Sequence, residues 1–208
     1  MTPILAGAKR PPVALRRQDA PLGYANRMET PDFDADGWFA RARRIPSPNC
    51  DARPHGTAIE LVVLHNIALP PGVFAGDAVI ALFTNRLDWD AHPYYQGIRG
   101  LEVSSHFLIR RDGSLIQFVP CALRAWHAGA SSWQGRARCN DFSVGIELEG
   151  SDDTPFTEAQ YAALAPLVAA LGRRYPIRGV VGHSDIAPGR KTDPGPCFDW
   201  RRLDGHAA

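Results

Sequence analysis

The chain has 208 residues, of which 45% are hydrophobic and 22% charged, and this length and composition fit one globular domain with a substantial core. The 23 Lys and Arg residues nearly balance the 22 Asp and Glu residues, so a net charge of +1 supplies no general attraction to nucleic acid or anionic lipid. No stretch approaches the roughly 20 apolar residues that span a bilayer. We therefore expect a soluble protein with no nucleic-acid or membrane partner, and no obligate protein partner is indicated.

The N-terminal residues 1–30 contain two basic clusters and several prolines but no apolar core of signal-peptide length. This composition predicts a disordered arm ahead of a folded domain over residues 31–208, with Met28 as a candidate alternative start. The four cysteines, at positions 50, 121, 139 and 197, have no short metal-binding spacing, and a chain this long needs no disulfide framework. Reduced thiols and the missing leader predict a cytoplasmic protein.

The first half of the domain contains one strongly apolar run. A short helix is expected over Asp36–Arg43, with Trp38 and Phe39 facing inward. The run at Ile59–Leu64 predicts a central strand buried on both faces, with His65 at its C-terminal end. The region Asn66–Val103, rich in Pro, Gly and aromatic residues, is expected to be largely irregular apart from a helix around residues 77–84. A segment of this length and kind usually has a function.

The second half begins with a hairpin, predicted over Ser105–Val119 because Asp112 and Gly113 accept the positive φ angles of a tight turn. The stretch Phe142–Glu149 alternates between apolar and polar or small residues, so a strand there places its two glutamates on one face. An amphipathic helix with an N-terminal capping box is predicted over Thr157–Tyr175. A last strand over residues 178–181 leads into the segment Gly182–Pro196.

Two histidines and one aspartate form the candidate centre. His65 and His183 each follow a predicted buried strand, and Asp193 lies in a loop that contains several prolines. Two imidazoles and a carboxylate are typical ligands of a catalytic zinc that keeps an open fourth position for water. The alternative is that both histidines make ordinary hydrogen bonds at strand ends, and spacing alone does not separate the two interpretations.

Several long segments carry a specific resemblance. The pieces VVLHNIALPPGVF, SSHFLIRRDGSLIQFVP, RAWHAGASSWQGRARCNDFSVGIELEG and GHSDIAPGRKTDPGPCFDW occur in this order between about Trp38 and Trp200. They resemble the AmpD-type 1,6-anhydro-N-acetylmuramyl-L-alanine amidases, cytoplasmic zinc enzymes that recycle cell-wall muropeptides. More distantly, they are similar to phage amidases and peptidoglycan recognition proteins.

The resemblance implies a single α/β domain with a mixed central sheet flanked by helices, and zinc held by His65, His183 and Asp193. It also implies that Glu147 is the base that activates water and that Lys191 stabilises the developing oxyanion. Each role is chemically sound, because a carboxylate can accept the proton of water and a cation favours the charge that forms during amide cleavage.

Further residues match positions of the family less decisively. Asn66 and Arg138 resemble residues that contact the stem peptide of the substrate, whose carboxylates suit an arginine fork. The resemblance leaves His106 and His127 outside the metal shell, where they could orient a ligand or contact substrate, or simply be core histidines. Glu102 departs from the family pattern, in which a basic residue often occupies that position.

The sequence therefore predicts a zinc amidase that cleaves the amide bond between anhydro-N-acetylmuramic acid and L-alanine. Two other functions stay open. One is an exported amidase of broader specificity that acts on intact wall, and the other is a peptidoglycan-binding module that does not cut its ligand. Such modules typically lack a zinc ligand, whereas the full predicted set is present here.

Overall fold

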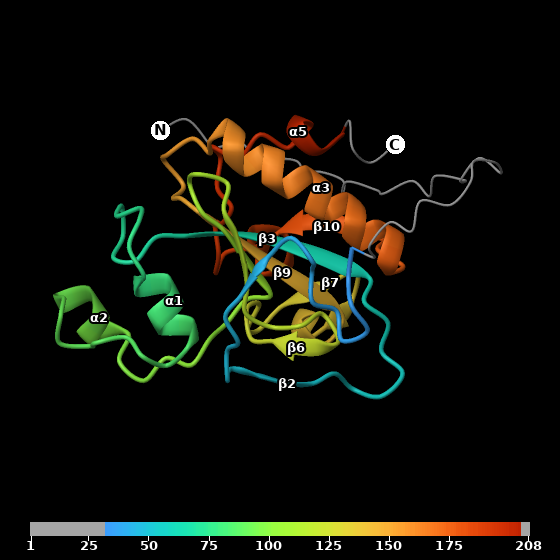
Figure 1. Cartoon of the computed structure of the whole chain (residues 1–208), viewed down its shortest axis with the longest axis horizontal. Coiled ribbons are helices and arrows are strands. Elements are labelled where there is room, and N and C mark those ends of the chain that lie inside the picture. Colours follow the sequence, from blue (N-terminus) through green and yellow to red (C-terminus); the bar gives the residue numbers. More distant parts are fainter. Residues whose placement is uncertain (1–31, 205–208) are drawn as a thin grey trace, which may run out of the picture.

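The computed structural model describes residues 32–204, and the arm predicted over residues 1–30 lies outside them. A mixed six-stranded sheet in the order β1-β5-β4-β9-β3-β10 forms the centre of the domain (Figure 1). Its strands are β1 (Arg43–Arg44), β3 (Leu61–Ile67), β4 (Phe107–Ile109), β5 (Leu115–Gln117), β9 (Ser143–Glu149) and β10 (Gly179–Gly182). Only the β4–β5 pair is antiparallel; the other neighbours in this sheet are parallel. This architecture confirms the predicted α/β fold.

One face of the sheet is covered by α3 (Glu158–Arg174), beside which lies α5 (Arg201–Asp204) (Figure 1). The predicted capping box is present at the start of α3, where the Thr157 side chain accepts from the Gln160 backbone and the Gln160 side chain accepts from the Thr157 backbone. The helix runs unbroken through Pro166. Between helix and sheet lies the largest core cluster, to which β9 contributes Val144, Ile146 and Leu148 as its alternation predicted.

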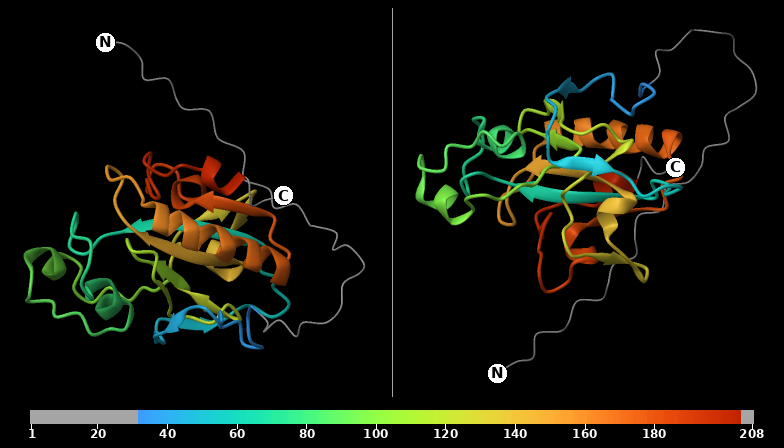
Figure 2. Two further views of the ribbon diagram at one scale, coloured as in Figure 1. Left: turned by 45° about the horizontal axis from the view of Figure 1, so that its top comes forward. Right: turned by 90° about the horizontal axis from the view of Figure 1, so that it is seen from below.

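The other face of the sheet carries shorter elements. These are α4 (His183–Ile186), the hairpin of β7 (Ser132–Trp133) and β8 (Arg136–Ala137), the 3-10 helix η1 (Cys139–Asp141), and the two-stranded pair of β2 (Cys50–Ala52) and β6 (Leu123–Ala125). The right-hand view of Figure 2 shows α3 on one side of the sheet and the β7–β8 hairpin on the other. This second face holds the polar and small residues of β9, so it is the face available for chemistry.

Beyond the C-terminal end of β3 lie α1 (Ala78–Phe83) and α2 (Pro93–Gly97), both within the region expected to be largely irregular (Figure 1). The predicted helix around residues 77–84 is confirmed by α1. Its apolar residues pack with those of β4 and β5 in a core cluster of their own. The region therefore packs onto the domain through a core that it shares with β4 and β5, and it projects from the end of the sheet where β3 stops.

The helix expected over Asp36–Arg43 is absent; turns and an isolated bridge between Phe33 and Phe39 take its place. Gly37 explains the difference, because its φ of 90° is left-handed and a Cβ there would lie 2.9 Å from the backbone nitrogen of Cys121. Phe39 is nevertheless buried as predicted. Across residues 32–204, no helix is long and apolar enough to cross a membrane.

Candidate metal centre and active site

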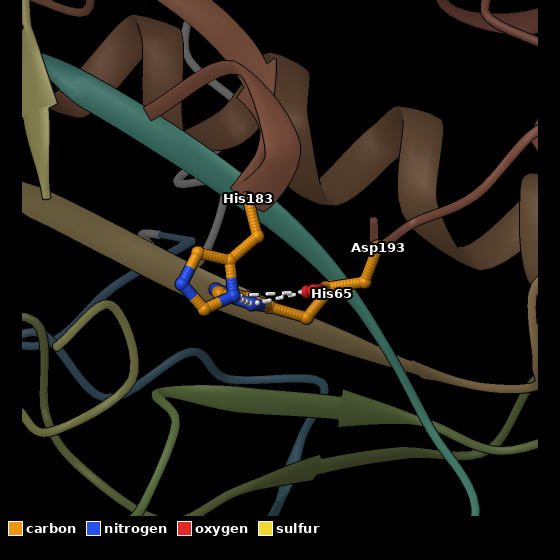
Figure 3. A group of neighbouring side chains, drawn as sticks. All are labelled: His65, His183 and Asp193. Carbon is orange, nitrogen blue, oxygen red and sulfur yellow. Dashed lines mark hydrogen bonds and ion pairs between the residues drawn. The ribbon is translucent and has the colours of Figure 1, made fainter. Parts of the chain in front are cut away.

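Two segments distant in sequence, strand β3 and the stretch that follows β10, bring His65, His183 and Asp193 together. β3 and β10 are parallel neighbours, so His65, near the end of β3, and His183, directly after β10, lie at the same edge of the sheet. Nδ1 of His65 lies 3.0 Å from Nδ1 of His183 and 2.9 Å from Oδ2 of Asp193, and Nδ1 of His183 lies 3.0 Å from that same oxygen (Figure 3). Three potential ligand atoms therefore face a common point.

Hydrogen bonding alone does not account for this triangle. Each Nδ1 carries at most one proton. If both nitrogens are protonated, their mutual contact joins two donors, and if only one is, at least one contact joins two acceptors. In addition, Nε2 of His183 lies 3.0 Å from the carbonyl oxygen of Ala128, and donating to it leaves Nδ1 of a neutral ring with a lone pair. A cation between the three atoms satisfies every contact, so the donor set fits a metal ion.

The electrostatics of the cluster suit the same role. Burial lowers the pKa of His65 to about 4, so its imidazole is neutral near pH 7. Burial opposes ionisation of Asp193, but the adjacent imidazoles of His183 and His65 outweigh that effect and hold the pKa of Asp193 below the usual range. A neutral imidazole and an ionised carboxylate are the forms that coordinate metals.

Glu147 projects from the strand beside the cluster. It is the register partner of His65 across the β3–β9 pair and is 8% exposed. One of its carboxylate oxygens, Oε2, is buried without a hydrogen-bond partner among residues 32–204. Burial and the charge of Asp193 raise its pKa well above the ordinary value, while Lys191 opposes them. A buried carboxyl group without a partner is costly in a purely structural role, so this one is free to act on a ligand.

Glu149, the competing carboxylate, has a different environment. Its Oε1 accepts from the backbone N–H of Ala75 at 2.9 Å, and its Oε2 accepts from the backbone N–H of Arg111 at 3.0 Å. Both oxygens therefore hold chain segments together. This contrast favours Glu147 as the reactive carboxylate.

Lys191 is exposed and lines the cavity above the cluster. Its loop is fastened by the neighbouring Arg190, which donates to the carbonyl oxygens of Ala128 and Ala130 at 2.8 Å each. Lys191 thus lies on an anchored loop and lines the same cavity as Glu147 and Asp193.

The other predicted site residues lie at different depths. Asn66 lines the cavity and donates to Oδ1 of Asp152 at 2.7 Å. His127 also lines the cavity, whereas His106 is fully buried and accepts from the backbone N–H of Gly145 at 3.0 Å. Arg138 does not line the cavity; its side chain is 71% exposed and pairs with Asp141.

The cavity itself has a volume of about 510 Å³, within the range of small-ligand sites. Its walls include Trp126, Asp152, Tyr94 and Leu101, none of which the sequence singled out. Tyr94 and Leu101 are each 43% exposed although they are large and apolar, which is typical of a ligand-contacting surface. The only sequence signal for them was the aromatic character of the region Asn66–Val103.

A mixed α/β domain with two histidines, an aspartate and an unpartnered glutamate at the base of an open cavity defines a hydrolase with a candidate metal centre. The family model for N-acetylmuramoyl-L-alanine amidases matches residues 55–196. The chain belongs to this N-acetylmuramoyl-L-alanine amidase family.

Individual relatives agree with this assignment. The 1,6-anhydro-N-acetylmuramyl-L-alanine amidase AmpD of Citrobacter freundii is 58% identical over 170 residues, which cover 81% of this chain and 91% of the relative. A crystal structure of a selenomethionine AmpD derivative superposes with a TM-score of 0.81 at 56% identity, over 84% of this chain and 98% of that one. The amidase AmiD of Escherichia coli, in complex with the substrate anhydro-N-acetylmuramic acid-L-Ala-D-γ-Glu-L-Lys, is 33% identical with a TM-score of 0.54, over 74% and 60% of the two chains.

Proposed function

We propose that this chain is a zinc-dependent amidase that hydrolyses the bond between 1,6-anhydro-N-acetylmuramic acid and L-alanine of muropeptides during peptidoglycan recycling. The observation that carries the proposal is the triangle of ligand atoms on His65, His183 and Asp193 beside the unpartnered carboxylate of Glu147. Zinc is the metal chosen because two imidazoles and one carboxylate form a common catalytic zinc set.

When bound, zinc supplies Lewis acidity, which polarises a carbonyl group and makes water more acidic. Glu147 is the residue that takes a proton from the attacking water, since its buried Oε2 makes no competing hydrogen bond. The carboxylic acid so formed then returns that proton to the leaving amine of L-alanine.

Lys191 is proposed to stabilise the oxyanion. Amide cleavage places negative charge on the former carbonyl oxygen, and a cation fixed nearby lowers the energy of that state more than it lowers the energy of the bound substrate. The anchoring of the preceding Arg190 supports this role, because a fixed charge loses little energy to reorganisation.

The proposed substrate follows from the relatives and the cavity. The name of the Citrobacter freundii relative specifies the anhydro-muramyl substrate, and a volume of about 510 Å³ suits a sugar with the first residues of a peptide. Asn66, in the cavity wall, and Arg138, outside it, are proposed contacts for nearer and more distant parts of the stem peptide. The exposed rings and apolar groups of Tyr94 and Leu101 would pack against the ligand.

A cytoplasmic location is part of the proposal. All four cysteines, at positions 50, 121, 139 and 197, are unpaired, and Cys121 and Cys139 are buried, which suits a reducing compartment. Cell fractionation with an antibody to the chain tests it, and recovery of the protein outside the cytoplasm would favour the exported amidase.

The central experiment combines metal analysis with product analysis. We expect about one zinc per purified chain, release of L-alanine-terminated peptide from a defined anhydro-muropeptide by mass spectrometry, and loss of activity on chelation that zinc restores. His65→Ala and His183→Ala should each empty the site. Zinc-independent cleavage would contradict the mechanism, cleavage of intact wall at equal rate would favour the broader amidase, and binding without cleavage would indicate a recognition module.

A further inference from the structure

His127 connects the metal cluster to strand β9. Its Nδ1 lies 2.9 Å from Nε2 of His65, and its Nε2 lies 3.1 Å from the hydroxyl oxygen of Ser143. The rings of His65 and His127 meet edge to face, with centroids 5.1 Å apart and an interplanar angle of 82°. A continuous line of hydrogen bonds therefore runs from Nε2 of the candidate ligand His65, through His127, to Ser143 on strand β9.

The proton positions in this line follow from one condition. If Nδ1 of His65 presents its lone pair to the cluster, the single N–H of the neutral ring is at Nε2 and donates to His127. His127 then accepts at Nδ1, carries its own N–H at Nε2, and donates to Ser143. The opposite arrangement would place a hydrogen on Nδ1 of His65, where it would block coordination.

Gly145 makes room for this arrangement. A Cβ at Gly145 would lie 2.5 Å from Cγ of His127, a distance that side chains do not tolerate, so the ring rests directly on the backbone of β9. The backbone N–H of Gly145 is in turn bonded to His106, which lies 5.8 Å from His127 between ring centroids. His127 is consequently held by the strand below it as well as by its two hydrogen bonds.

We propose that His127 is a positioning residue that fixes the tautomer and the ring orientation of His65, so that Nδ1 of His65 is directed at the metal. The inference rests on the proposed metal site. Partners that orient a ligand in this way typically change metal affinity about 10–100-fold when they are removed. Ser143 acts through His127 by accepting its remaining N–H.

A matched pair of variants isolates the hydrogen bond. Asn places an acceptor oxygen near the position of Nδ1, whereas Leu has nearly the same shape and no acceptor. Zinc affinity of the full chain, measured by competition with a chromogenic chelator, should fall about 10–100-fold in His127→Leu and stay within about threefold of wild type in His127→Asn. The exposed His55→Ala serves as the control for loss of a histidine.

The visible spectrum of the cobalt-substituted protein adds a readout that a general loss of stability does not move. It should change in His127→Leu and resemble wild type in His127→Asn. If the Leu variant does not fold, Ser143→Ala decides, because it removes one oxygen and should still weaken zinc binding by about tenfold.

The outcomes separate the two proposals. If the wild-type chain binds zinc and His127→Leu or Ser143→Ala binds it with unchanged affinity, the role of His127 is overturned while the metal site stands. Equal losses in the Leu and Asn variants also overturn it, since the acceptor would then not be the cause. A wild-type chain that binds no zinc overturns the metal site and this inference together.

Discussion

Glu147 and His65 are register partners on the adjacent parallel strands β9 and β3. Side chains of paired residues project from the same face of a sheet, and the backbones that carry them are about 4.8 Å apart. The candidate base and one candidate metal ligand are therefore held by two adjacent interior strands of the central sheet. Their relative position depends on sheet hydrogen bonds, whereas Asp193 and Lys191 depend on a loop.

Replacement of Glu147 by Gln should leave zinc in place and lower turnover about 10²–10⁴-fold, the usual contribution of a positioned general base. The amide keeps the shape of the side chain but does not accept the proton of water. Metal content and steady-state turnover of the same preparation check this prediction.

Glu149→Gln is the matched control, because Glu149 lies two residues along the same strand face. It weakens bonds to the backbone N–H groups of Ala75 and Arg111, so stability should fall by about 1–3 kcal/mol with far less effect on turnover. A larger loss of turnover in Glu149→Gln than in Glu147→Gln would contradict the assignment of the base.

Lys191→Met should lower turnover roughly 10²–10³-fold with zinc and fold retained, as when one oxyanion donor is removed. Methionine preserves part of the stem and removes the charge. The Michaelis constant should change less than turnover, because the charge that Lys191 meets exists mainly in the transition state. Normal turnover with a raised Michaelis constant would instead make Lys191 a substrate-binding residue.

The parts of the fold that were predictable from the sequence depend on local pattern. The alternation in β9, the Asp112-Gly113 turn and the capping box at Thr157 each involve neighbours in the chain, and each is present in the structure. The helix expected at Asp36–Arg43 fails for a non-local reason, since the contact of Gly37 with Cys121 requires a turn.

The candidate site likewise contains residues that the sequence indicated and contacts that only the folded chain creates. His65, His183 and Asp193 were identifiable as a candidate metal centre, because the histidines follow predicted apolar strands and the aspartate lies in a proline-rich loop. The family resemblance supplied the choice of Glu147 over Glu149 and the role of Lys191. The sequence marked His127 only as a histidine that could orient a ligand, contact substrate or lie in the core. Its contacts with His65 and Ser143 could not be predicted, because they join residues on separate segments whose proximity only the folded sheet creates.

The metal-free protein should lose stability as the pH falls from about 7 toward 4. The pKa of His65 is about 4 in the folded chain against an ordinary value of 6.5, and burial also holds the pKa values of His106 and His127 well below 6.5. At a pH between the folded and unfolded pKa values of such a histidine, the unfolded chain binds more protons than the folded chain. The contribution of each histidine to the free energy of unfolding is therefore fully present above about pH 6.5 and declines below it, by roughly 1.4 kcal/mol per pH unit. The raised pKa of Glu147 acts in the opposite sense, since the folded state then retains a proton that the unfolded chain releases as the pH rises.

His106→Asn tests the origin of this slope. The hydrogen bonds described for His106 do not involve the three ligand residues, and Asn keeps an acceptor for the N–H of Gly145 while removing the titratable ring. Urea unfolding with chelator present, at several pH values between 4.5 and 7, should give a shallower dependence than wild type. An unchanged slope would show that His106 does not contribute.

Arg53 should be one of the most stabilising side chains outside the apolar core. Its guanidinium donates to four backbone carbonyl oxygens, those of Cys121, Asn140, Asp141 and Ser143. It also contacts the ring of His106. Burial lowers its pKa to about 10, so it stays charged at neutral pH. One side chain thus links three segments, namely the loop that follows β5, the 3-10 helix η1 and the start of β9.

Arg53→Met should therefore lower the free energy of unfolding by about 3 kcal/mol, because several buried carbonyl groups lose their donor together. Arg53→Lys should recover little, since a single ammonium does not reproduce the planar fork. Arg99→Met is the control: Arg99 pairs with Asp90 at the surface, where both side chains are more than half exposed, so its loss should barely move the urea midpoint. Because Arg53 also positions the Ser143 backbone, Arg53→Met should weaken zinc binding as well. Equal stability of the Arg53→Met and Arg99→Met proteins would contradict the stabilising role of Arg53.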